Sequence, residues 1–166
     1  MSVSEARSVI ERIAVILYDR LNVLTTGIKP TAAIREVVRP TRLGGYTPQH
    51  MQIVLVQNDP VENEELFRPG NPPAIAFDQQ FDIHCHLLPS EIDPTPIDEY
   101  INTLQADVVE AITDAGSRWF TFGNLAVHSQ WGAMELIQAS GSIDGFMLPL
   151  TVTYRTSEWT PYQVRV

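Results

Sequence analysis

The sequence predicts an α+β fold, a mostly antiparallel β-sheet with two α-helices packed on one face. Apolar residues recur at helical spacing in two segments, near the N-terminus and over residues 96–115, whereas strand-like alternation fills the segments between and after them. Runs of strands separated by only two helices are typical of α+β proteins. With 166 residues, 44% of them hydrophobic, we expect one domain over residues 1–166.

The first helix is predicted to run to about Leu24, with Ser4 as its N-cap and the glycine of Thr25-Thr26-Gly27 as its stop. Its apolar residues follow a 3.6-residue period, which places them on one stripe of the helix. These residues are Ile10, Ile13, Ala14, Leu17, Tyr18, Leu21 and Leu24.

Two strands are expected after this helix. Ala33–Arg39 alternates, so Ile34 and Val38 would share one face while Val37 lies on the other. Gln49–Gln57 is apolar on both faces, which is typical of a central strand.

The clearest strand pattern covers residues 75–87, where apolar and polar residues alternate. One side of the sheet should therefore be covered here and the other should meet solvent or a partner. The apolar face would carry Ile75, Phe77, Phe81, Ile83, Cys85 and Leu87, and the polar face Ala76, Asp78, Gln80, Asp82, His84 and His86.

A turn is expected over residues 89–94, followed by the second helix. Thr95 supplies its N-cap and Pro96 its first position, and the helix should run to about Ala115, before Gly116. Three strands are predicted for the last fifty residues, over Trp119–Val127, Met134–Gln138 and Gly145–Thr156. In the last of these, one face would carry Phe146, Leu148, Leu150, Val152 and Tyr154.

Residues 58–73 are predicted to form a long loop, because they contain four prolines, one glycine and four acids. We expect this loop to project from the body, so that deleting residues 60–70 leaves the fold intact. It lies in the acidic third of the chain. Residues 58–115 carry one basic and thirteen acidic groups, a net charge of −12 within a total of −9.

The charge distribution and the first residues limit the classes of function. A chain with a single lysine and an acidic excess offers no basic stripe for phosphates, so tight nucleic-acid binding is not expected. No apolar run is long enough to span a bilayer, and residues 1–7 do not resemble a secretory signal. We therefore expect no membrane association and folding in a reducing cytoplasm.

Few residues suggest chemistry. His84 and His86 lie two apart on the polar face of a strand with Asp82 beside them, a spacing that can ligate a divalent metal. Nothing else metal-like accompanies them, so polar residues on an exposed strand face are the simpler interpretation. Cys85 should point into the core. We predict no catalytic, cofactor or metal site, and no enzymatic activity.

The C-terminal third carries a recognisable set of residues: Trp119, Phe122-Gly123, Ala126, Trp131, Glu135, Ser140-Gly141, Asp144-Gly145-Phe146, Leu150–Thr156 and Pro161-Tyr162. With this set the chain resembles the tail terminator proteins of long-tailed bacteriophages, also called tail-completion or neck proteins. In these proteins a final strand ending in a Tyr-Arg pair and a tail with a Pro-Tyr pair are frequent, and the opening helix over Ile10–Leu21 is also similar.

The resemblance implies a tail-terminator-like fold and a structural role in the virion, assembled in the host cytoplasm. Six copies would form a ring that caps the tail tube, ends its polymerisation and offers the surface for head docking. Implied partners are further copies of the chain, the tail tube protein, head–tail connector proteins and passing genomic DNA without specific binding. Candidate interface residues are Asp59, Glu62, Glu64, Glu65, Arg68, Tyr154, Arg155 and Tyr162.

Two other functions stay open. The first is another neck or connector role, such as head completion or tube joining. The second, from a different class, is a small metal-dependent enzyme that uses Asp82, His84 and His86.

Overall fold

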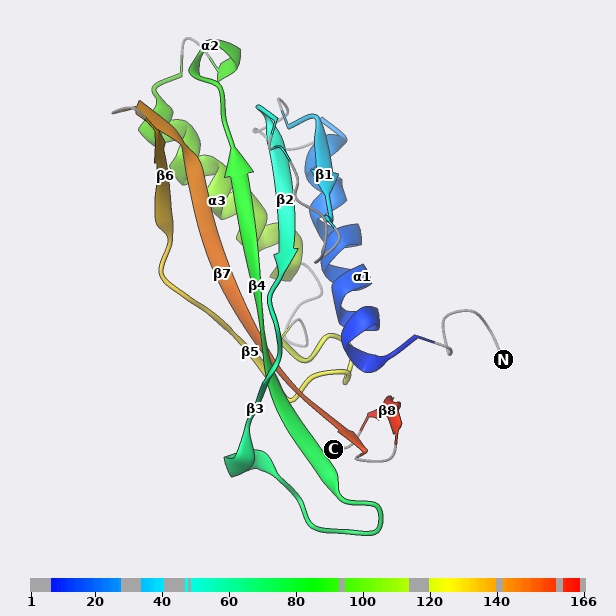
Figure 1. Ribbon diagram of the computed structural model, residues 1–166. Helices are drawn as coiled ribbons and strands as arrows, with labels where there is room; N and C mark the ends of the chain where they lie inside the picture. The colour runs from blue at the N-terminus through cyan, green and yellow to red at the C-terminus, as the bar shows by residue number, and fades with distance from the viewer. Residues whose placement is uncertain are drawn as a thin grey trace.

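The computed structural model describes residues 7–27, 34–40, 47, 49–92, 95–113, 120–139, 142–157 and 160–164. Within these ranges the chain forms three α-helices and an eight-stranded sheet, so the predicted α+β class is confirmed (Figure 1). The two long helices lie on one face of the sheet, as expected.

The helices are α1 (Val9–Asn22), α2 (Pro89–Ile92) and α3 (Ile97–Thr113), with two 3-10 helices, η1 (Val23–Thr25) and η2 (Glu64–Leu66). The strands are β1 (Glu36–Val38), β2 (Gln52–Gln57), β3 (Val61–Glu62), β4 (Ala74–His86), β5 (His128–Trp131), β6 (Glu135–Ala139), β7 (Ser142–Ser157) and β8 (Thr160–Val164).

The sheet is built on a long central pair, β4 and β7, which run antiparallel from the Ala74–Ser157 pair to the His86–Gly145 pair. β2 and β3 pair along the outer edge of β4, and β6, β5 and β8 pair in turn along the outer edge of β7. Only β1 and β2 are parallel among the described strand pairs. The mostly antiparallel sheet is therefore confirmed.

The core lies between this sheet and the helices α1 and α3. Over Phe81–His86 of β4 and Phe146–Val152 of β7, buried side chains that point toward the helices alternate with less buried side chains on the opposite face, as the sequence predicts. Fully buried members include Ile13, Leu17 and Leu21 of α1, Leu104, Val108 and Ile112 of α3, and Phe81, Ile83, Phe146 and Leu150 of the sheet.

The first helix begins later than predicted. Ser4 lies outside the described residues, and α1 starts at Val9 with Ser8 as its N-cap, whose side chain accepts a hydrogen bond from the Glu11 amide. At the other end of the predicted helix, η1 carries the chain on to Thr25. Three serines precede the apolar stripe, and the nearest one, Ser8, caps the helix.

The strand predicted over Trp119–Val127 is wrong. Trp119 lies outside the described residues, and residues 120–127 form turns before β5 begins at His128. Phe122, Gly123 and Asn124 adopt positive φ angles of 48°, 67° and 70°, a left-handed conformation that a strand cannot contain. The apolar residues of this segment pack on the core as a turn, with Phe122 fully buried.

Three further expectations need correction. The described residues of the predicted strand over Ala33–Arg39 form β1 only at Glu36–Val38, and Ile34 and Val37 are both buried instead of lying on opposite faces. The turn predicted over residues 89–94 contains α2. In the first half of β4 the burial alternation changes, because Ala74 and Ala76 become buried under the segment that precedes them.

Candidate interaction surface

The segment predicted as a loop, residues 58–73, is a folded arm. It contains β3 and η2 and doubles back along the first half of β4, at the end of the sheet farthest from α2 (Figure 1). We call residues 58–73 the arm. Its structure corrects the expectation of a simple long loop, because a third of its length is in regular elements paired with or packed on the sheet.

Backbone hydrogen bonds fix the arm to β4 at both ends. β3 pairs Val61 with Asp78, and the amide of Asn63 donates to the carbonyl of Ala76 at 2.9 Å. Farther along, Arg68 and Ala74 exchange two backbone hydrogen bonds of 3.0 and 2.9 Å. Satisfied backbone groups at both ends hold the arm in register with the sheet.

Arg155 fastens the middle of the arm. Its side chain crosses the sheet from β7, and Nε donates a 3.0 Å hydrogen bond to the carbonyl of Leu66 in η2. Only 7% of Arg155 is exposed, and burial together with the charge of Arg68 lowers the pKa of its guanidinium. A buried charged donor of this kind holds its acceptor more strongly than a neutral donor would.

Asp78 connects the arm to both central strands. Its carboxylate accepts hydrogen bonds from Asn63 Nδ2 at 3.0 Å and from Thr153 Oγ1 at 2.6 Å. Thr153 is buried on β7. Because one carboxylate on β4 holds a side chain of the arm and a side chain of β7, the arm is fixed relative to the sheet.

Tyr154 belongs to the core face of β7, opposite the face that carries Arg155. Its ring stacks on Phe77 with centroids 5.6 Å apart, and only 5% of the residue is exposed. Phe77 is also the strand partner of Glu62 in the arm. Tyr154 and Arg155 were both predicted as interface residues; both are buried within the chain, and Arg155 bonds to the arm.

The outer surface of the arm is acidic and partly apolar. Asp59, Glu62, Glu64, Glu65 and Arg68 are exposed, so five predicted interface residues gather on one projecting element. Tyr162 lies in β8, and its side chain is outside what the structure describes.

Sequence reasoning missed two exposed apolar residues of the arm. Val61 is 66% exposed and Phe67 is 47% exposed, the two highest values among the large hydrophobic residues of the described chain. Val61 and Phe67 lie among acidic residues in a segment with few other apolar residues. This isolation in the sequence could have identified them as exposed. An exposed aromatic ring on a rigid, charged element is typical of a contact surface.

The histidine pair forms a second polar cluster, on the sheet face opposite the helices. The rings of His84 and His86 stack with centroids 6.1 Å apart, and burial lowers the pKa of both. His50 approaches from the turn before β2, where Nδ1 lies 3.2 Å from the carbonyl of Leu87, and it lowers the pKa of His86 further.

Asp82, the proposed third metal ligand, is engaged elsewhere. Its two carboxylate oxygens accept hydrogen bonds from Asn58 Nδ2 at 2.8 Å and Gln80 Nε2 at 2.7 Å. No group of three or more histidine, cysteine or acidic side chains in the described ranges is arranged to hold a metal ion. The Asp82–His84–His86 set therefore lacks the converging geometry that a metal centre requires.

Cys85 faces the helices, as the alternation predicts. It is fully buried, and burial raises the pKa of its thiol far above the usual range. A thiol of this kind is a poor nucleophile and packs as a small apolar side chain.

Comparisons with known proteins return no match, either to a protein-family model or to a curated protein. Among the helices that the structure describes, none is both long enough and apolar enough to cross a membrane.

Proposed function

We propose that the chain is a structural protein of a tailed bacteriophage, in which six copies form a ring that caps the tail tube. The observation that carries the proposal is the arm, an acidic projection fixed to the body by buried polar contacts through Asp78 and Arg155. A rigid projection of this kind suits an assembly contact. The resemblance of the C-terminal third to tail terminators supplies the kind of assembly.

Two segments of the chain differ in charge in a way that suits a ring. A closed ring of identical copies uses two different surfaces of each copy, one for each neighbour. Residues 1–57 carry seven basic and four acidic groups, a net charge of +3, and the arm carries four acids and one arginine. Opposite charges on two surfaces favour head-to-tail pairing over pairing of like surfaces.

The overall charge also suits a channel for DNA. A total charge of −9 on each copy repels the phosphate backbone, so DNA can pass without adhering to the ring. In this proposal the partners are further copies of the chain, the tail tube protein and head–tail connector proteins. The protein works in the virion after assembly in the host cytoplasm, and it has no catalytic role.

Imaging of tails assembled with and without the protein tests the proposal. We expect tails made without it to vary in length and, in addition, to fail to join heads. Tails of normal length that lack only head attachment would support a connector role instead. Tails that stop at the normal length and join heads would refute both virion roles.

Metal analysis of the purified protein tests the rival enzymatic role. Stoichiometric zinc, iron or manganese that is lost when both His84 and His86 are replaced by glutamine would support an enzyme. The described geometry gives no support to that outcome, because Asp82 already accepts two hydrogen bonds.

A further inference from the structure

We propose that the arm of one copy docks in the groove between α1 and β1 of the next copy, with Phe67 and Val61 as its apolar contacts. The inference deepens the ring proposed above and rests on it. The structure describes both halves of this contact, one exposed on the arm and one on the helix side of the body.

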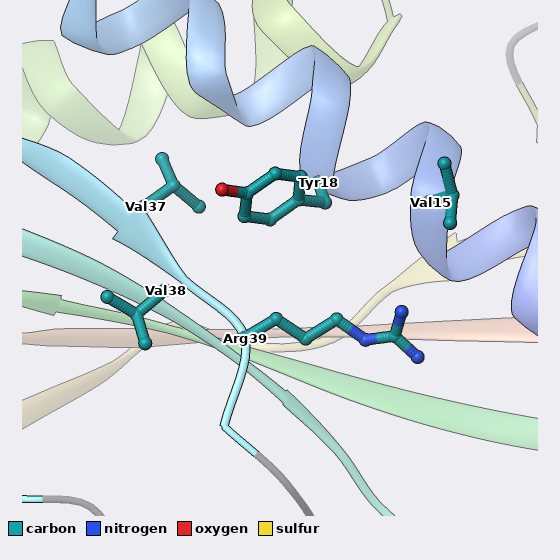
Figure 2. A pocket seen from close by; sticks show the side chains of 5 residues that line it. All are labelled: Val15, Tyr18, Val37, Val38 and Arg39. Carbon is teal, nitrogen blue, oxygen red and sulfur yellow. The ribbon is translucent and has the colours of Figure 1, made fainter.

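The groove is apolar and preformed. Val15 and Tyr18 of α1 face Val37, Val38 and Arg39 at the end of β1, around a space of about 410 Å³. Figure 2 shows the ring of Tyr18 beside Val37 and the Arg39 side chain extended along the groove. An aromatic side chain that enters such a space would bury most of its apolar surface.

Arg39 lines the groove and is held in place by hydrogen bonds. Its guanidinium donates to both carboxylate oxygens of Glu11 at 2.8 and 2.7 Å, and to Gln57 Oε1 at 3.0 Å. The fork geometry of this pair ties α1 to the strand end across the groove. β1 is also the terminal strand in the order of the described sheet, so the groove opens at the sheet edge.

The arm has the complementary properties. Val61 and Phe67 are its exposed apolar residues, and four acids against Arg68 give it a net charge of −3. The described residues that form the groove side, 7–27 and 34–40, carry five basic and three acidic groups, a net charge of +2. The two segments therefore carry net charges of opposite sign, which favours pairing of the arm with this side of the body.

An arm cannot reach the groove of its own chain. The β1 residue Val38 is level with Val54 and His84 across the sheet, whereas Val61 pairs with Asp78 and Arg68 pairs with Ala74. Along β4, Asp78 lies about 20 Å and Ala74 about 33 Å from His84. Because hydrogen bonds fix the arm to β4, an arm that occupies the groove must come from a second copy.

Site-directed cross-linking of the full-length chain tests this contact. We would prepare Phe67→Cys and Val61→Cys on the arm, and Val15→Cys and Val38→Cys in the groove, each as a separate protein. A short bis-maleimide should link arm variants to groove variants in mixtures at high protein concentration, and should leave each variant alone mostly unlinked. The native Cys85 is fully buried and so does not compete.

A matched control sets the background. Leu136→Cys on β6 replaces a side chain that is 45% exposed, close to the 47% of Phe67. We expect the yield of cross-linked dimer to be at least about tenfold higher for the arm–groove pairs than for pairs that contain Leu136→Cys. The reason is that Phe67 would lie at the centre of the interface, whereas Leu136 would lie outside it. Equal linking would overturn the docking inference.

The outcome is independent of the tail experiment. If arm–groove linking occurs but tails do not need the protein, the docking stands and the terminator function falls. If tails need the protein but linking stays at the Leu136→Cys level, the function stands and the docking falls.

Discussion

At the residue scale, the clearest prediction concerns Leu150. Its side chain is fully buried in β7, opposite Phe81 of β4. Leu150→Ala should lower the free energy of unfolding by about 2–5 kcal/mol, because it removes apolar burial and leaves a cavity. Denaturant unfolding followed by circular dichroism measures the change.

Leu136 gives the matched control, since it is the same residue type in the same sheet but 45% exposed. Leu136→Ala should change the free energy of unfolding much less than Leu150→Ala. Equal effects of the two substitutions would mean that β7 does not have this register.

The histidines on the open sheet face predict a dependence of stability on pH. Burial lowers the pKa of His84, which Asp82 partly opposes. Burial also lowers the pKa of His86, with further lowering by His84 and His50 and a raising effect of Asp144. In the unfolded chain both groups titrate near the ordinary value of about 6.5. On acidification the unfolded state therefore binds protons first, and stability falls as the pH drops from about 6.5 toward the lowered folded values.

Replacing both His84 and His86 by glutamine should reduce this acid sensitivity. We expect the double variant to fold at neutral pH and to lose less stability than the wild type between about pH 8 and about pH 5. His128→Gln, on an exposed side chain of β5, is the control. An unchanged pH dependence in the double variant would contradict burial of the pair.

At the element scale, the sequence predicts the long amphipathic elements well. Alternation over residues 145–156 matches β7, where Phe146, Leu148, Leu150 and Val152 are buried on one face. The stripe of α1 is correct as well, since a 3.6-residue period reports directly on the buried face. Such elements are predictable because the burial of one face sets the spacing of their apolar residues.

The elements that sequence reasoning misses depend on tertiary contacts. β3 has two residues, and it exists because Val61 and Glu62 pair with β4, a contact that periodicity cannot show. The turn at Phe122–Asn124 has strand-like composition but left-handed backbone angles. For the candidate surface, composition identifies the exposed acids, but it cannot show that Tyr154 and Arg155 are buried or that Arg155 bonds to the arm.

Arg155 leads to a prediction at this scale. Arg155→Met removes the hydrogen bond to the Leu66 carbonyl while keeping a long side chain over Ala76. Losing a charged hydrogen bond costs about 1.5–3 kcal/mol, so the arm should open at least about tenfold more often. A glutamate-specific protease detects this, because Glu62, Glu64 and Glu65 lie in the arm.

Arg68→Met is the control for Arg155→Met, since it removes an exposed arginine of the same arm. We expect faster cleavage only for Arg155→Met, at a temperature well below the melting transition of both variants. Similar cleavage of the two variants would show that Arg155 does not hold the arm.

At the scale of the whole molecule, the structure changes how the arm should be tested. The amide of Asn58 donates to the carbonyl of Gln80, whereas Arg68 pairs with Ala74. Ala74 and Gln80 lie about 20 Å apart along β4, and the four residues that would remain between Asn58 and Ala74 after deletion of residues 60–70 reach at most about 18 Å. That the deletion leaves the fold intact stays a prediction, and point substitutions test the arm without shortening its connection to β4.

The arm acids predict a salt-sensitive assembly. The triple variant Glu62→Gln, Glu64→Gln and Glu65→Gln keeps the shape of the exposed surface and removes three charges. Its melting curve should match the wild type, because exposed substitutions usually change stability by no more than about 0.5 kcal/mol. Ring assembly should weaken, and the wild-type ring should weaken likewise at high salt, which screens the arm charges.

Native mass spectrometry and imaging of assembled tails measure the effect on the ring. A control triple variant, Asp98→Asn, Glu110→Gln and Glu135→Gln, removes three exposed acids outside the arm and gives the same change of net charge. If net charge alone governed assembly, the two triple variants would behave alike. Weakening confined to the arm variant would locate the electrostatic contact on the arm, because only there do the acids lie beside the exposed apolar residues Val61 and Phe67.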